Sequence, residues 1–285
     1  MTDDDRGKGA VEIVALLFKT ILLRPYVFAF LAAFLLCSWR LLGWTRTWLF
    51  FFNTWLTALL CELSSTRNGF PFGWYFYNGS TEGEELYLWN VPVMDPLSFP
   101  FLLFASYCLA LWFLLPAHAS PSSDGSAGVP ALRFDSPTRR SWRVIGLTAF
   151  FFALIDVVID PVALRGDRWF LGKIYFYPES GIHFGVPLSN YLGWAVVALI
   201  SLAVYRVIDA QLPAAATFST ASLQTTGNVL LGCGLYYGVL VFNLAVTFWI
   251  GEGLLGTTGL LMYLPITVLA ILRFHGRLAP VIVDR

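Results

Sequence analysis

Apolar runs long enough to cross a lipid bilayer recur along nearly the whole 285-residue chain. A helix needs about 20 residues to cross a hydrocarbon core about 30 Å thick. Hydrophobic residues make up 57% of the chain and charged residues 13%, whereas ordinary soluble domains carry about 25% charged residues. The sequence therefore predicts an all-α, polytopic membrane helical bundle, and it leaves no stretch long enough for a separate soluble domain.

The pattern predicts about seven spans within a single integral membrane domain, residues 25–285. The expected spans are residues 25–42, 48–63, 92–115, 144–162, 187–208, 229–250 and 254–274. Residues 1–24 are expected to form a polar head and an interfacial helix, since apolar residues recur there at helical spacing with Lys19 and Arg24 among them. We expect a multi-pass protein of the cell membrane.

One connection, residues 116–143, is rich in Ser, Gly and Pro and ends in several arginines. This composition predicts a flexible linker on the cytoplasmic side of the membrane. The formal net charge of the whole chain is +0, without long basic runs, which argues against nucleic acid as a partner. The four cysteines lie in or beside apolar runs without metal-ligand spacing and are expected to be core residues.

Two short segments match each other in order. "VPVMDPLSF" from Val91 aligns with "VPLSNYLGW" from Val186, so that Asp95 aligns with Asn190, and upstream "YFYN" aligns with "YFYP". The prolines suit the first turn of a helix. The match predicts an internal repeat of two like-oriented helical hairpins, residues 48–115 and 144–208, whose aromatic loops emerge on one face and enclose one site.

Acidic side chains inside or at the ends of the expected spans are the candidate catalytic groups: Glu62, Asp95, Asp156 and Asp160. An ionised acid at the centre of a span costs roughly 2.5–3.5 kcal/mol. Asp156 and Asp160 share one helical face, and two close carboxyls do not both ionise, which makes one of them a candidate proton donor. Structural alternatives are a helix-capping role for Asp95 and pairing of the other two aspartates with Arg165 or Arg168.

The two loops, "FPFGWYFYNG" and "RWFLGKIYFYP", concentrate aromatic residues. An interfacial aromatic belt accounts for many of them, but their density in both loops also suits an apolar pocket for a long conjugated or polyisoprenoid ligand. His183 is either a proton relay or an interfacial hydrogen-bonding residue. The candidate binding residues are Tyr75, Tyr77, Trp169, Tyr175, Tyr177, His183 and Asn190.

The block "DPVALRGDRWFLGKIYFYPESGIHFGVPLSNYLGW", with "PFGWYFYN" and "VPVMDPLSF", resembles the CruF-type membrane carotenoid 1′,2′-hydratases, which include the bisanhydrobacterioruberin hydratases. The resemblance covers residues 62–194. The first block departs from the family pattern by an acidic insertion, "STEGEELYLWN". Three roles are open for this insertion: a lid, a surface for a partner, or a solvated loop. The simplest expectation is a solvated loop.

The resemblance implies addition of water to the terminal double bond of an acyclic carotenoid ψ end, giving a tertiary 1′-hydroxyl. It implies that the substrates are water and an acyclic or monocyclic carotenoid such as lycopene, and that the protein lies in the bilayer. Other carotenoid-pathway enzymes are further candidate partners, and the resemblance implies no cofactor. Such chemistry needs a carboxylic acid, a positioned water and aromatic walls that stabilise a cation. Asp156 or Asp160 is expected to donate the proton. Asp95 or Glu62 is expected to orient the water, with Asn190 as a hydrogen-bonding partner of Asp95.

Two other kinds of function remain open at the level of sequence. A membrane carotenoid cyclase would use the same protonation and quench the cation with an internal alkene. A non-enzymatic carotenoid-binding or transport protein would also carry intramembrane acids and helical repeats. Polyprenyl transfer is disfavoured, because paired aspartate-rich metal motifs are absent from the polar loops of the sequence.

Overall fold

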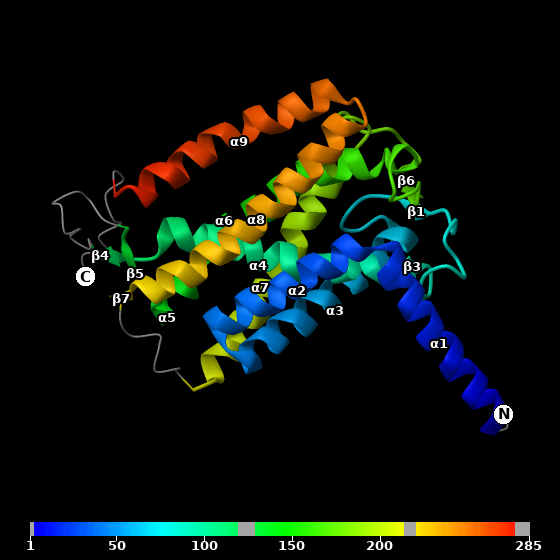
Figure 1. Cartoon of the computed structure of the whole chain (residues 1–285), viewed down its shortest axis with the longest axis horizontal. Helices are drawn as coiled ribbons and strands as arrows, with labels where there is room; N and C mark the ends of the chain where they lie inside the picture. The colour runs from blue at the N-terminus through cyan, green and yellow to red at the C-terminus, as the bar shows by residue number, and fades with distance from the viewer. Residues whose placement is uncertain (1–2, 119–128, 214–220, 277–285) are drawn as a thin grey trace.

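The computed structural model describes residues 3–118, 129–213 and 221–276, and these residues are mostly helical (Figure 1). The helices are α1 (Asp3–Leu23), α2 (Pro25–Leu42), α3 (Trp44–Asn68), α4 (Met94–Leu114), α5 (Ser136–Arg139), α6 (Trp142–Ala163), the 3-10 turn η1 (Gly166–Arg168), α7 (Leu188–Gln211), α8 (Leu223–Trp249) and α9 (Gly253–Phe274). The short strands are β1 (Phe76–Tyr77), β2 (Tyr87–Leu88), β3 (Val91–Pro92), β4 (Ala117–His118), β5 (Ala131–Arg133), β6 (Tyr175–Phe176) and β7 (Ala221–Ser222).

Six helices in the described part of the chain are long and apolar enough to cross a bilayer: α2, α4, α6, α7, α8 and α9. The chain is therefore a multi-pass membrane protein. The sequence also predicts a span within α3, which is 25 residues long and packs against α4 and α7. Because α3 carries many Thr, Ser and Asn side chains, it does not reach the same apolarity, and the seventh span stays a prediction.

Helix α4 lies at the centre of the bundle and packs against α2, α3, α6 and α8. Helix α4 carries apolar side chains on all of its faces, as expected for a helix buried among other helices. Close approach to α8 occurs at Gly232, where a Cβ atom would come within 2.2 Å of the sulfur of Cys108. Small residues at such crossings let two membrane helices pack closely.

Local sequence signals set the helix ends. Pro25 begins α2, and Gly43, with φ of 79°, separates α2 from α3. The hydroxyls of Ser141 and Ser222 accept hydrogen bonds from the N–H groups of the residues three positions later and so cap α6 and α8.

The two aromatic loops meet at one end of the bundle. β1 pairs with β6 in antiparallel fashion, with Phe76 opposite Phe176 and Tyr77 opposite Tyr175. The prediction that both loops emerge on the same face is therefore confirmed, and β1, β3 and β6 lie together at the right of Figure 1. The internal repeat itself stays a prediction.

At the opposite end, the described part of the predicted linker packs against the bundle, and the flexibility of residues 116–143 as a whole stays a prediction. Residues 119–128 lie outside the described part of the chain, but β5 pairs with both β4 and β7, and Leu132 and Phe134 are fully buried. The buried side chains of Leu132 and Phe134, on either side of Arg133, anchor the described part of this connection to the bundle.

The acidic insertion is more than a solvated loop. Glu85 is buried and forms an ion pair of 3.0 Å with Arg24, whose side chain is also fully buried. The guanidinium of Arg24 also donates to the carbonyl of Leu171, and the hydroxyl of Thr20 accepts a hydrogen bond from the N–H of Leu86. The junction of α1 and α2 is thereby tied to the acidic insertion and to the second aromatic loop. A buried carboxylate needs such a partner, which composition alone does not reveal.

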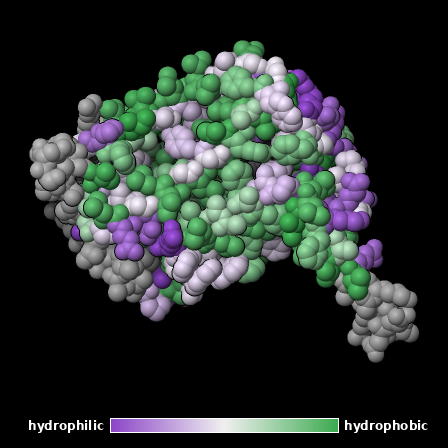
Figure 2. Space-filling view, in the orientation of Figure 1, coloured by the Kyte–Doolittle hydropathy of each residue, from purple (hydrophilic) through white to green (hydrophobic). Residues whose placement is uncertain are grey.

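The molecular surface fits a membrane environment. Figure 2 shows apolar residues over most of the visible face, with hydrophilic residues gathered near the two ends of the long axis. Many large apolar side chains of the spans are exposed, including Leu192 of α7, Val241 of α8 and Leu261 of α9. In water such a surface would aggregate, and in a bilayer it contacts lipid tails.

Candidate functional site

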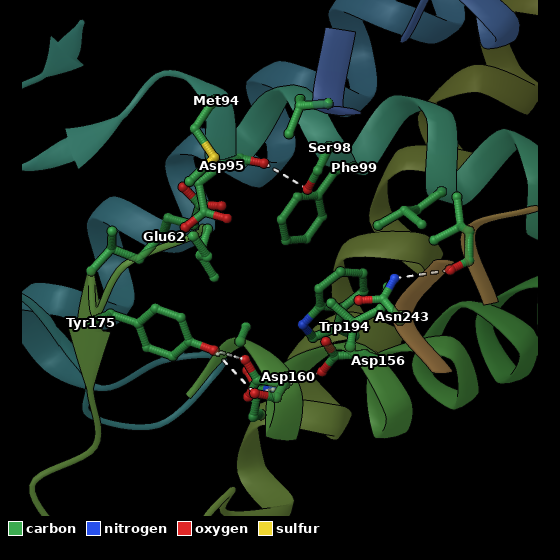
Figure 3. A pocket seen from close by; sticks show the side chains of 18 of the residues that line it. Glu62, Met94, Asp95, Ser98, Phe99, Asp156, Asp160, Tyr175, Trp194 and Asn243 are labelled. Atoms are coloured by element: carbon green, nitrogen blue, oxygen red, sulfur yellow. Dashed lines mark hydrogen bonds between the residues drawn. The ribbon is translucent and has the colours of Figure 1, made fainter. Parts of the chain in front are cut away.

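A cavity of about 140 Å³ lies within the bundle beneath the paired aromatic loops. Helices α2, α3, α4, α6, α7 and α8 and both loops contribute to its wall. Figure 3 shows Glu62 and Asp95 on one side of the open space, with Tyr175, Asp160 and Asp156 across from them. The structure brings together these residues expected from the sequence: Glu62, Tyr75, Tyr77, Asp95, Asp156, Asp160, Trp169, Tyr175, Tyr177 and Asn190.

One wall holds two aspartates bridged by an amide. The side-chain nitrogen of Asn190 donates to an oxygen of Asp156 at 2.6 Å and to an oxygen of Asp160 at 3.0 Å. Asp160 also accepts hydrogen bonds from Tyr177, at 2.6 Å, and from Tyr175. Three donors on Asp160 stabilise its carboxylate form, whereas Asp156 receives a donor on one oxygen only.

The other wall holds Glu62 from α3 and Asp95 from the first turn of α4. Asp95 accepts a hydrogen bond from the hydroxyl of Tyr77, a residue of the first aromatic loop. Glu62 is buried and lies close enough to Asp95 for the two carboxyls to influence each other. Each wall thus pairs two acids with at least one tyrosine from the loop above it.

Two buried carboxyl oxygens have no hydrogen-bond partner among the described residues: Oδ1 of Asp156 and Oε2 of Glu62. Both carboxyls line the cavity. A buried polar atom without a partner is costly, and a position of this kind at a cavity is where a bound molecule or water supplies the missing bond. Asp156 and Glu62 therefore each retain an unused hydrogen-bonding position beside the cavity.

The loop tyrosines remain neutral donors. Burial, reinforced by the nearby carboxyls, raises the pKa of Tyr75, Tyr77, Tyr175 and Tyr177 well above the usual value. Their hydroxyls therefore keep their protons at physiological pH, and the hydroxyls of Tyr77, Tyr175 and Tyr177 donate to the aspartates.

The structural alternative of an arginine partner does not hold for Asp156 and Asp160. Arg165 pairs with Glu252 at 3.1 Å, and Arg168 pairs with the same carboxylate, so both arginines are directed to the α8–α9 turn. Asp95 lies in the first turn of α4, where the helix dipole favours a negative charge, so this structural role stays open beside its contact with Tyr77. The described contacts of these aspartates are therefore made to polar groups of the cavity.

Two expectations about loop and helix residues are corrected. Asn190 does not pair with Asp95, since its side-chain amide bridges Asp156 and Asp160 instead. His183 lies outside the cavity wall, and its Nε2 is 3.2 Å from the carbonyl oxygen of Val157. Sequence alignment placed Asn190 opposite Asp95, but the side-chain direction of α7 turns the amide toward α6.

An aromatic floor and an additional side wall are features that sequence reasoning missed. Phe99 and Trp194 stack with ring centroids 4.5 Å apart, and Phe152 packs against Trp194 at 4.6 Å. Tyr26 and Phe242 line the cavity from α2 and α8. Phe99 and Trp194 occupy matching positions of the two aligned segments, which is a signal that could have found them; the residues from α2 and α8 carry no comparable signal.

Comparison with known proteins adds one match. The sequence model of a protein family with the description "Carotenoid biosynthesis protein" matches residues 13–264 of this chain. No curated protein and no solved structure matches the chain. The match includes every cavity residue named above.

Proposed function

The chain belongs to the carotenoid biosynthesis protein family, and from this premise we propose that it is a carotenoid hydratase of the cell membrane. In this proposal it adds water to the terminal 1′,2′ double bond of an acyclic carotenoid ψ end. The observation that carries the proposal is the pair of carboxyl groups of Asp156 and Glu62, which line one aromatic cavity and each carry a buried oxygen without a hydrogen-bond partner among the described residues. Alkene hydration by acid catalysis needs a proton donor and a water acceptor in just such an apolar site.

Asp156 is the proposed proton donor. The amide of Asn190 occupies one oxygen of Asp156, so the proton of the neutral acid resides on Oδ1, the oxygen without a partner. Asp160 carries the negative charge of the pair, because its three donors stabilise the carboxylate. The proton of Asp156 forms a C–H bond at the less substituted alkene carbon, and the π electrons leave a tertiary cation at the other carbon.

The opposite wall supplies the water. Glu62 and Asp95 orient a water molecule, whose oxygen forms the C–O bond to the cation while its proton passes to a carboxylate. The net change is addition of H and OH across one double bond, with a tertiary alcohol as product. The faces of Phe99, Trp194 and Tyr75 stabilise the cation without acting as nucleophiles.

Expression in a lycopene-producing host, with pigment analysis by mass, tests the proposed reaction. We expect a product heavier than lycopene by one water. Asp156→Asn should reduce its formation by at least about 100-fold, the loss typical for removal of a general acid. An isomeric product would identify a cyclase, and an unchanged pigment profile would contradict enzymatic activity on lycopene.

The matched control is Glu84→Gln, which alters an exposed acid of the insertion. This variant should hydrate lycopene at the wild-type rate. If Asp156→Asn retains full turnover, Asp156 is not the donor.

A further inference from the structure

The cavity is too small to hold a whole carotenoid. Its volume of about 140 Å³ is below the roughly 300–1,000 Å³ of pockets that enclose a complete drug-sized ligand. If the proposed function is correct, only one end group lies among the carboxyls, and the remaining polyene must leave the cavity through its wall. The question is which part of the wall it crosses.

The loop side of the cavity is polar. Tyr77 and Tyr177 lie there with their hydroxyls bound to Asp95 and Asp160. A long apolar chain crossing this region would displace hydrogen bonds of buried carboxylates, at a cost that apolar contacts do not offset. This side is suited to the passage of water and protons.

The side formed by α2 and α8 is aromatic and apolar. Tyr26 and Phe242 stack with ring centroids 5.3 Å apart, and Phe30 packs against Phe242 at 5.7 Å; all three residues line the cavity and are half-buried. Phe170 contacts Tyr26 at 5.4 Å and is 50% exposed. These rings contact one another in an unbroken series, from the three that line the cavity to the exposed Phe170.

We infer that the polyene leaves the cavity through this aromatic seam, defined as Tyr26, Phe30, Phe170 and Phe242, and continues into the bilayer. Flat aromatic faces pack well against a conjugated chain. The inference rests on the proposed function and assigns its substrate a mode of binding: one end enters sideways from the lipid, while water reaches the carboxyls from the loop side.

The inference also gives the acidic insertion a role. Arg24 lies just before Tyr26 and is held by Glu85 of the insertion and by the carbonyl of Leu171, next to Phe170. This buried contact fixes the start of α2 relative to the second loop. Arg24 and Glu85 are therefore positioning residues for the aromatic seam.

The test compares Phe242→Ala with Val241→Ala, a change at an adjacent residue of α8 that is 61% exposed and outside the cavity wall. KM is measured for lycopene and for a short acyclic terpene with the same terminal alkene; for a ligand that is not turned over, its inhibition constant replaces KM. We expect Phe242→Ala to raise the constant for lycopene about tenfold, with little change for the short ligand. Val241→Ala should leave both constants unchanged.

The short ligand also reports on folding, because a misfolded variant would bind neither ligand. Should Phe242→Ala not fold, Phe242→Leu keeps most of the volume without the aromatic face and should give a smaller shift in the same direction. If Phe242→Ala changes the constants of both ligands equally, or leaves the constant for lycopene unchanged, the aromatic seam is not the exit of the polyene. Hydration of lycopene by the wild-type protein would still support the proposed function. A wild-type protein that hydrates no acyclic carotenoid would overturn both.

Discussion

Asn190 shows how one neutral side chain organises two acids. Its amide donates to both Asp156 and Asp160, which lie one turn apart on α6. A cation at this position would neutralise the pair, and a third acid would add repulsion. A neutral donor instead lets one aspartate stay protonated while the other is ionised, which is the condition for acid catalysis in the proposed reaction.

Replacement of Asn190 by Ala should therefore reduce kcat for carotenoid hydration by about 10- to 100-fold, since hydrogen bonds to charged groups contribute about 1.5–3 kcal/mol. Leu192→Ala is the control, because Leu192 lies on the same helix, is 67% exposed and does not line the cavity. It should leave turnover unchanged. Both variants are assayed with lycopene under identical expression, and wild-type kcat in Asn190→Ala would refute this role.

At the level of elements, the crossing of α4 and α8 depends on a missing side chain. A Cβ at Gly232 would lie 2.2 Å from Sγ and 2.5 Å from Cβ of Cys108. Cys108 belongs to the fully buried centre of α4, where neighbouring helices leave little room for movement. By contrast, a Cβ at Gly234, two residues along α8, would meet no atom within 4 Å.

We therefore expect Gly232→Ala to destabilise the folded bundle by about 1–3 kcal/mol, the usual cost of overpacking. Gly234→Ala should be neutral or slightly stabilising, since alanine favours helix more than glycine does. Thermal unfolding in detergent, followed by helical circular dichroism, measures both. Equal Tm values for the two variants would show that α4 and α8 do not approach each other as described.

On the scale of the whole molecule, charge is distributed unequally between the two ends. The end with β4, β5 and β7 carries many arginines, and Asp209 there pairs with Arg46, Arg139 and Arg140. The other arginines of this end in the described residues are Arg40, Arg133, Arg143, Arg206 and Arg273. The cavity end mixes acids and bases, including Glu82, Glu84 and Lys173. Positive charge favours the cytoplasmic side of a membrane.

This asymmetry predicts that the arginine-rich end faces the cytoplasm and the aromatic loops face the opposite side. The orientation is tested by introducing one additional cysteine at each of two exposed positions: Glu84→Cys in the insertion and Gln211→Cys at the end of α7. A membrane-impermeant maleimide should label Glu84→Cys in intact cells and Gln211→Cys only after permeabilisation. The wild-type protein controls for its native cysteines, and the reverse pattern would invert the orientation.

Much of the architecture is determined by the sequence alone. Hydropathy predicts the apolar helices, because the cost of burying polar backbone and side chains in lipid is set within each segment. Pro25 and Gly43 mark helix boundaries through local backbone geometry. The same reasoning identifies the four intramembrane acids and the two aromatic loops as candidates for one site, and the cavity includes all four acids.

Only the tertiary structure decides which side chains meet. It assigns Asn190 to Asp156 and Asp160 in place of Asp95, buries Glu85 against Arg24, and brings Tyr26 and Phe242 from two helices outside the aligned segments into the cavity wall. These contacts join residues far apart in the chain. Their geometry depends on helix rotation and crossing, which many packed side chains determine together and which hydropathy, an average over each segment, does not record.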